Sequence, residues 1–116
     1  MVEAVPHGED WIGIDLGTSN SCVGLWVDEG RPGDIKATDK VEILPNPDGA
    51  NSRTTPSVVL YKNDGSVVVG AKALNQMTGQ PKNALYNVKR IIGKAYSEVQ
   101  GARDLVPYDI VEGPKG

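Results

Sequence analysis

The sequence predicts an α/β fold in which a mixed sheet is accompanied by short helices. Apolar residues alternate with small or polar ones over residues 11–27, the pattern of half-buried strands. Runs rich in β-branched residues follow at 57–61 and 66–70, and helical segments are predicted at 71–78 and 83–92. The 14 glycines and 8 prolines among 116 residues indicate many turns and a modest core.

The first predicted hairpin joins a strand at residues 11–16 to a strand at residues 21–27. Side chains along a strand alternate between its two faces, so one face of the first strand is apolar and holds Ile12, Ile14 and Leu16. The opposite face consists of two glycines and one carboxylate, Gly13, Asp15 and Gly17. Such a face does not suit a core, and it leaves room for a ligand to approach closely.

The turn of this hairpin is built from small polar residues. Hydroxyl, amide and backbone N–H donors, which suit a phosphate group, are supplied by Thr18, Ser19, Asn20 and Ser21. Asp15 is placed beside them to hold a hydrated metal ion, and Mg²⁺ keeps several waters and needs few carboxylates. The pattern predicts a nucleotide-phosphate hairpin. No P-loop motif occurs in the sequence.

The next segments lead from the hairpin to a second pair of strands. Residues 28–40 are rich in Gly, Pro and acidic residues and predict a solvated loop, after which 41–44 predicts a third strand. Residues 45–52 predict a turn region, and Pro56 holds the residue before it in an extended conformation. The Lys-Asn-Asp-Gly sequence at 62–65 then predicts a hairpin turn.

Two helices are expected after this second hairpin. The first runs from Ala71 to Thr78, and the second is capped by Asn83 and runs to Ile92, with Gly93 as its stop. In the second helix an apolar stripe is formed by Leu85, Val88 and Ile92. Lys89 lies at the rim of that stripe, where its ammonium either points at a specific partner or only reaches solvent.

Charge and hydropathy exclude several classes of function. A net charge of −3 gives no basic field for nucleic acid or an anionic membrane, and the apolar runs are too short to span a bilayer. The acidic first ten residues argue against a targeting signal, and the single cysteine, Cys22, cannot form an internal disulfide. We therefore expect a cytoplasmic protein.

Four blocks in order carry a family resemblance. The stretch from Ile12 to Trp26 reads IGIDLGTSNSCVGLW and is similar to the opening of the 70-kilodalton heat-shock protein chaperones, within the actin-like ATPase superfamily. The further blocks are Val41–Leu44, Asn51–Ser57 and Asn83–Gly93. The resemblance implies the N-terminal portion of the actin-like (ribonuclease H-like) fold. It implies a flexible lead-in at 1–10, the first strands of the nucleotide-binding lobe at 11–52, and part of an outer subdomain at 53–116.

The same resemblance implies roles for named residues. Asp15 would position Mg²⁺, while Gly17, Thr18, Ser19 and Asn20 would hold the phosphates of ATP or ADP. Lys89 would face the terminal phosphate and orient the attacking water. The second threonine common in the family is replaced here by Ser19, which keeps the hydroxyl, and the loops at 28–40 and 45–52 are longer than usual. These departures indicate a divergent member.

The resemblance also implies a biological role. ATP hydrolysis would drive cycles of binding and release of unfolded polypeptides in the stress response, with J-domain proteins and nucleotide-exchange factors as co-chaperones. Neither nucleic acid nor a membrane is expected as a partner. The second lobe of such a nucleotide cleft lies downstream, so the chain is expected to be truncated and, in isolation, to lack ATPase activity.

Three alternatives remain open from the sequence. The partial fold could be a short binding module that does not hydrolyse ATP. Asp15 and the residues after it are also similar to the Asp-Thr-Gly turn of homodimeric aspartic proteases, although Leu16 lacks the hydroxyl that those enzymes use next to the aspartate. A sugar kinase of the same superfamily would begin with a similar turn, but the blocks at 53–57 and 89–93 favour the chaperone.

Overall fold

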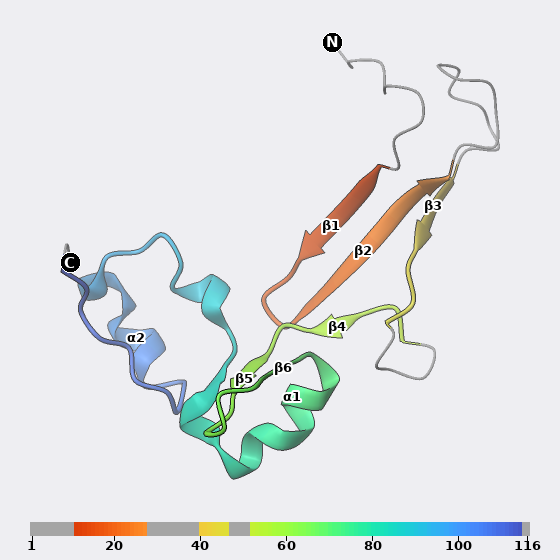
Figure 1. The fold of residues 1–116 in the computed structure, drawn as a ribbon. Helices are drawn as coiled ribbons and strands as arrows, with labels where there is room; N and C mark the ends of the chain where they lie inside the picture. Colours follow the sequence, from red (N-terminus) through yellow and green to blue (C-terminus); the bar gives the residue numbers. More distant parts are fainter. Residues whose placement is uncertain (1–10, 28–39, 47–51, 115–116) are drawn as a thin grey trace.

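The computed structural model describes residues 11–27, 40–46 and 52–114. The predictions for residues 1–10 and for most of the 28–40 and 45–52 loops lie outside these ranges. The described chain contains two antiparallel sheets and several short helices, as Figure 1 shows. The predicted α/β class with short helices is confirmed, but the strand pairs of the described residues are all antiparallel, whereas a mixed sheet was expected.

The first sheet is built on a long hairpin. β1 (Ile12–Leu16) pairs with β2 (Asn20–Val27), and β2 pairs on its other side with β3 (Lys40–Ile43). The start of β2 also pairs with the short strand β4 (Thr55–Pro56), so that Asn20 lies opposite Pro56. The predicted hairpin and third strand are confirmed, as is the extended conformation of Thr55 before a proline.

The second sheet holds the hydrophobic core of the described residues. β5 (Val59–Tyr61) lies between β6 (Val67–Val69) and β7 (Ala84–Leu85), and α1 (Ala71–Gln76) packs against β5 and β6. The core cluster consists of fully or nearly fully buried side chains from these elements and the residue before β5: Val58, Leu60, Ala73 and Ala84. The predicted hairpin over 57–70 and the helix after it are confirmed, the latter ending in a 3₁₀ turn, η1 (Met77–Gly79).

The predicted helix from Asn83 to Ile92 is wrong. Asn83 ends a 3₁₀ turn, η2 (Pro81–Asn83), and the chain is then extended in β7. Asn87 has a left-handed backbone (φ 57°), and only a single 3₁₀ turn, η3 (Val88–Arg90), follows. Pairing of Ala84 with Leu60 in β5 buries this segment, and that burial outweighs its local helical pattern. Gly93 has the expected left-handed conformation, with φ 76°.

The C-terminal part of the chain forms a separate small lobe. It contains the 3₁₀ turn η4 (Tyr96–Val99) and the one-turn helix α2 (Gln100–Arg103). Tyr108 ties the segment after α2 to the residue that follows β7, because its hydroxyl donates a 2.6 Å hydrogen bond to the carbonyl oxygen of Tyr86. The two rings also meet edge to face, with centroids 6.0 Å apart.

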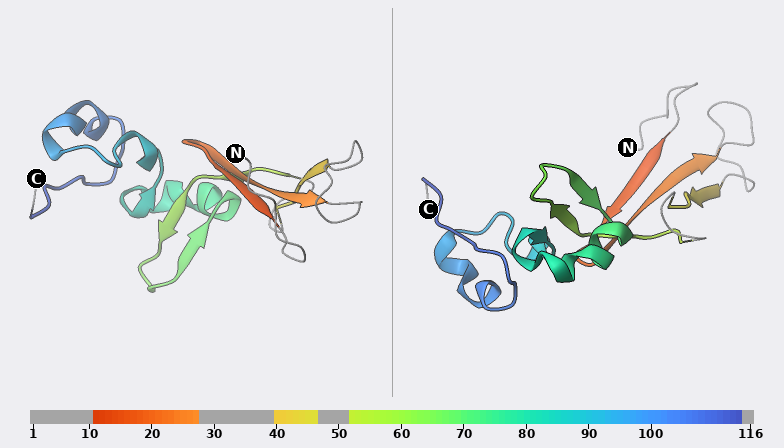
Figure 2. Two further views of the ribbon diagram at one scale, coloured as in Figure 1. Left: turned by 90° about the horizontal axis from the view of Figure 1, so that it is seen from above. Right: turned by 60° about the horizontal axis from the view of Figure 1, so that its bottom comes forward.

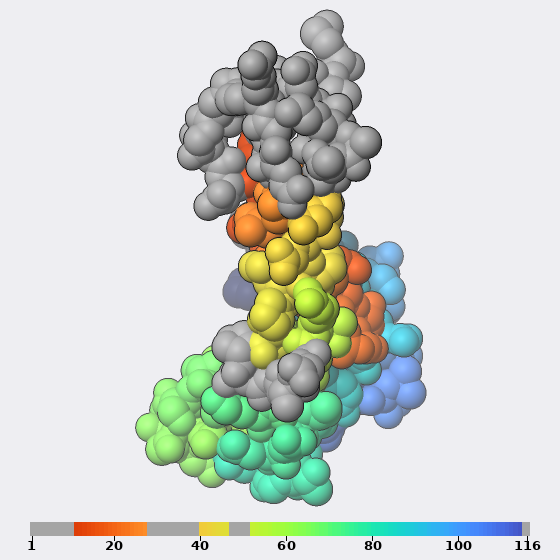
Figure 3. Space-filling view, turned by 90° about the vertical axis from the view of Figure 1, so that its right-hand side faces the viewer, coloured from red at the N-terminus to blue at the C-terminus, as the bar shows by residue number. Residues whose placement is uncertain are grey.

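The molecule is elongated rather than spherical. Its radius of gyration is 19.0 Å, whereas a compact domain of this length would have about 13 Å. The first sheet projects from one end and the C-terminal segment from the other, as the two views of Figure 2 show. In the space-filling view of Figure 3, the first sheet (orange and yellow) forms a narrow layer above the broader unit around α1 (green). No helix in the described ranges is long and apolar enough to cross a bilayer.

Candidate functional site

Asp15 lies on β1, an outer strand of the first sheet, and Gly13 beside it is open. Its cross-strand partner on β2 is Cys22, and two residues along the strand Gly13 lies opposite Gly24. Side chains alternate along a strand and opposite residues share a face, so both glycines lie on the same face of the sheet as Asp15. Gly24, in contrast to Gly13, is buried beneath the side chains of Val41 and Ile43. The carboxylate is exposed, and a methyl group built on Gly13 would meet no atom within 4 Å. A ligand can therefore approach the backbone closely beside this carboxylate.

The turn between β1 and β2 is too tight for a side chain at its first position. A Cβ atom built on Gly17 would lie 2.1 Å from the carbonyl oxygen of Asn20, far inside van der Waals contact. Thr18 is half-buried, whereas Ser19 and Asn20 are exposed. The predicted donors are thus gathered on one short turn at the end of the sheet.

Ser57 anchors this turn, although the sequence did not mark it as a site residue. Its backbone N–H donates a 2.8 Å hydrogen bond to the carbonyl oxygen of Ser19. Its hydroxyl donates a 2.9 Å hydrogen bond to the carbonyl oxygen of Gly17 and lies 2.9 Å from the hydroxyl of Ser21. The only sequence signal was the position of Ser57 at the end of a family block, because a contact across 40 residues has no local pattern.

Lys89 lies on a different element from the hairpin. It is exposed on η3, and no hydrogen bond or ion pair within the described ranges connects it to the turn at Gly17. The apolar stripe that was expected to bury its stem is absent, because Leu85 lies in a strand and Ile92 is 70% exposed. The helical-spacing argument for Lys89 is therefore wrong, and its proposed role depends on the family resemblance.

The apolar face predicted for β1 exists but is uncovered. Ile12, Ile14 and Leu16 are between 61% and 65% exposed. Within the described ranges, the order of this strand therefore comes from its backbone pairing with β2 and not from burial of its side chains.

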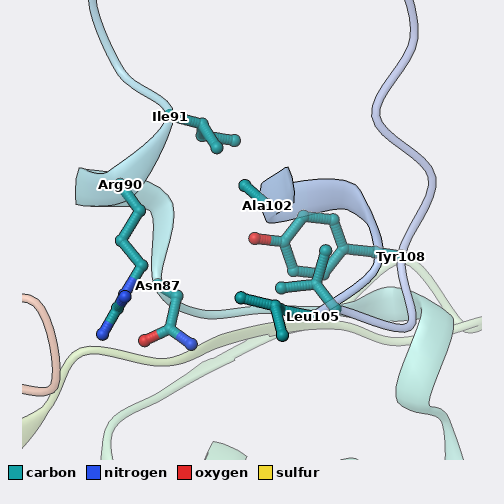
Figure 4. Close-up of a pocket in the computed structure, with 7 residues that line it drawn as sticks. Asn87, Arg90, Ile91, Ala102, Leu105 and Tyr108 are labelled. Atoms are coloured by element: carbon teal, nitrogen blue, oxygen red, sulfur yellow. The ribbon is translucent and has the colours of Figure 1, made fainter. Parts of the chain in front are cut away.

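Neither of two cavities elsewhere in the chain involves the hairpin. Figure 4 shows one between η3 and the segment around α2, where Tyr108, Leu105 and Ala102 face Asn87 and Arg90. Its volume of about 10 Å³ is room for about one water molecule. A second, open hollow of about 130 Å³ lies nearby and includes Lys94 and Tyr96. The hairpin donors instead lie on an open surface.

The donor set of the hairpin suits a metal-bound phosphate. Within the described ranges, no group of three or more His, Cys, Asp or Glu residues could enclose a metal ion. The exposed carboxylate of Asp15 offers hard oxygen ligands to Mg²⁺ or to its water shell, and the adjacent turn offers N–H and hydroxyl donors. These residues can hold a hydrated magnesium phosphate but cannot form a closed protein cage.

Comparison with known proteins identifies the family to which the sequence is similar. The family model described as "Hsp70 protein" matches residues 11–116. A curated relative, the chaperone protein DnaK of Burkholderia cenocepacia, is 43% identical over 107 residues, which make up 90% of this chain and 15% of the relative. The chain thus spans about one seventh of the length of that relative.

Proposed function

The chain belongs to the Hsp70 family, and on that premise we propose that it carries the phosphate-binding hairpin of an ATP-dependent molecular chaperone. The observation that carries the proposal is the arrangement of the first hairpin. An exposed carboxylate, the open glycine Gly13 and a tight polar turn lie together on β1 and the turn that follows it. This arrangement suits binding of ATP or ADP together with Mg²⁺.

The residues would divide the chemistry in the following way. Asp15 would orient Mg²⁺ through its water shell, and Gly17, Thr18, Ser19 and Asn20 would hold the phosphates. Lys89 would orient the attacking water in the complete protein. Phosphoryl transfer needs mainly positioning and charge stabilisation from the protein, so a turn and two charged side chains can carry much of this work.

The chaperone cycle is the wider part of the proposal. Hydrolysis of ATP would drive binding and release of unfolded polypeptides, aided by J-domain proteins and nucleotide-exchange factors, in the cytoplasm. Residues 11–52 would belong to the nucleotide-binding lobe, and residues 53–116 would form part of its outer subdomain. The isolated 116 residues would lack ATPase activity because one hairpin on an open surface cannot close around a nucleotide.

Kinetics of the complete protein test the assignment of Lys89. Lys89→Ala should leave ATP binding intact and lower single-turnover hydrolysis by a factor on the order of 10² or more. Lys94→Ala is the matched control, because Lys94 is also exposed but lies beyond η3. Equal hydrolysis rates in Lys89→Ala and the unsubstituted protein would refute the role of Lys89.

A binding experiment tests Asp15 separately. Asp15→Asn keeps the size of the side chain and removes its charge, so it should weaken ATP binding in Mg²⁺ and have less effect in EDTA. The mass of the native product, detected with an antibody against this chain, tests the wider proposal. A product several-fold heavier than 12.3 kDa would support the chaperone, and a product at 12.3 kDa would favour the non-hydrolysing module.

A further inference from the structure

We propose that Ser57 is a positioning residue that directs the Thr18 N–H of the phosphate-binding turn toward the bound nucleotide. This proposal rests on the proposed function, since it assigns a task within that same site. Ser57 lies outside the hairpin, directly after β4, and it is half-buried. It would act on the ligand only through the turn that it holds.

Ser57 binds the phosphate-binding turn at more than one atom. Pairing of β4 with the start of β2 brings Ser57 alongside the turn. The Ser57 N–H then binds the Ser19 carbonyl at 2.8 Å, and the Ser57 hydroxyl binds the Gly17 carbonyl at 2.9 Å. Two of the carbonyl groups of the turn are thus held by one residue from another part of the chain.

The second step is the placement of hydroxyl protons. A serine hydroxyl has one proton to donate, and that of Ser57 goes to the Gly17 carbonyl. In the 2.9 Å contact between the Ser57 and Ser21 hydroxyls, Ser21 must therefore be the donor. A directed chain runs from Ser21 through Ser57 to Gly17. Ser21, one of the four polar residues first expected to face a phosphate, uses its proton inside the protein.

The third step is the geometry of the peptide bond that follows Gly17. The Gly17 carbonyl and the Thr18 N–H belong to one planar trans peptide, so they point in opposite directions. A carbonyl held toward Ser57 directs the Thr18 N–H away from it. Within the described ranges, no protein acceptor binds the Thr18 N–H. The hydrogen bond from Ser57 also polarises this peptide unit, which strengthens its N–H as a donor.

Nucleotide binding by the complete protein tests the proposal with three variants. Ser57→Ala removes the hydroxyl, Ser57→Thr keeps it, and Ser66→Ala is the matched control because it loses a hydroxyl hydrogen bond on a remote exposed turn. We expect Ser57→Ala to weaken ATP and ADP binding about tenfold, the effect of about one hydrogen bond. Adenosine has no phosphate, so its affinity should be unchanged. Ser57→Thr should restore ATP affinity.

The same measurements contain the outcomes that overturn the proposal. Unchanged ATP affinity in Ser57→Ala would overturn it, as would equal weakening of ATP and adenosine, because a general loss of structure does not depend on phosphates. If Ser57→Ala fails to fold, Ser57→Thr and Ser57→Cys provide the comparison, and Cys should bind ATP more weakly than Thr because a thiol is a weak donor. If the unsubstituted protein does not bind ATP, the proposed function falls as well. If the unsubstituted protein binds ATP and Ser57→Ala binds it with the same affinity, only the positioning role of Ser57 is refuted.

Discussion

The two sheets of this protein are held together in different ways. In the second sheet, Leu60 is fully buried between neighbouring strands and α1, whereas in the first sheet Ile14 is 63% exposed. The first sheet nevertheless carries the candidate site, and its turn is held by hydrogen bonds from Ser57. Core packing thus dominates the second sheet, and backbone pairing and polar anchoring dominate the first. Substitutions should therefore have opposite patterns of effect in the two regions.

The largest effect is expected from a substitution that disrupts the core of the second sheet. Leu60→Ala should lower the free energy of unfolding by about 2–5 kcal/mol, because it removes a fully buried side chain and leaves a cavity. Ile14→Ala in the first sheet is the matched control and should change stability by about 0.5 kcal/mol or less. Urea unfolding followed by circular dichroism measures both. Equal losses would show that the apolar face of β1 is buried as deeply as the core.

The next largest effect is expected from a substitution that disrupts the turn of the first sheet. Gly17→Ala should cost about 1–3 kcal/mol, because its new methyl group would collide with the Asn20 carbonyl oxygen and force the backbone apart. ATP affinity should fall together with stability. Gly101→Ala is the control, since a Cβ there meets no atom within 4 Å. Isothermal titration and thermal unfolding of both variants would settle the prediction, and normal ATP binding by Gly17→Ala would contradict it.

A smaller effect concerns the anchor of the C-terminal segment. Tyr108→Phe should cost about 1 kcal/mol, because it removes the hydrogen bond to the Tyr86 carbonyl and keeps the ring packing. Burial, with a further contribution from the neighbouring Tyr86, raises the pKa of Tyr108 above its ordinary value of 10.0. The stability from the neutral phenol is therefore present below pH 10 and lost as the pH rises through the folded pKa. A Tyr108→Phe protein should lose less stability than the unsubstituted protein above pH 10.

The smallest effect is expected at the exposed turn between β5 and β6 of the second sheet. Hydrogen bonds from the hydroxyl and backbone N–H of Ser66 lower the pKa of Asp64 below its ordinary value of 3.8. A lowered folded pKa stabilises the protein above pH 3.8, and this contribution is lost as the pH falls through the folded value. Asp64→Asn should therefore reduce the acid sensitivity of unfolding slightly. An unchanged acid transition would show that this turn contributes nothing measurable.

Local patterns were sufficient to predict most of the strands. Alternation over residues 11–27 predicted β1 and β2, and the Lys-Asn-Asp-Gly turn predicted the hairpin of β5 and β6. These patterns succeed because strand alternation and turn chemistry act between residues that are close in sequence. The helix prediction for residues 83–92 failed because pairing with β5, which is remote in sequence, outweighed the helical spacing of this segment.

The sequence by itself determined the class of the fold, the polar hairpin with Asp15 and its turn, and the family to which they are similar. Residue type and local spacing carry that information. Only the tertiary structure decided that Ser57 holds the turn, that Lys89 lies on an exposed 3₁₀ turn, and that the core lies in the second sheet. The physical reason is that long-range pairing and burial choose among locally acceptable conformations, and the spacing of residues along the chain does not encode which distant partner is met.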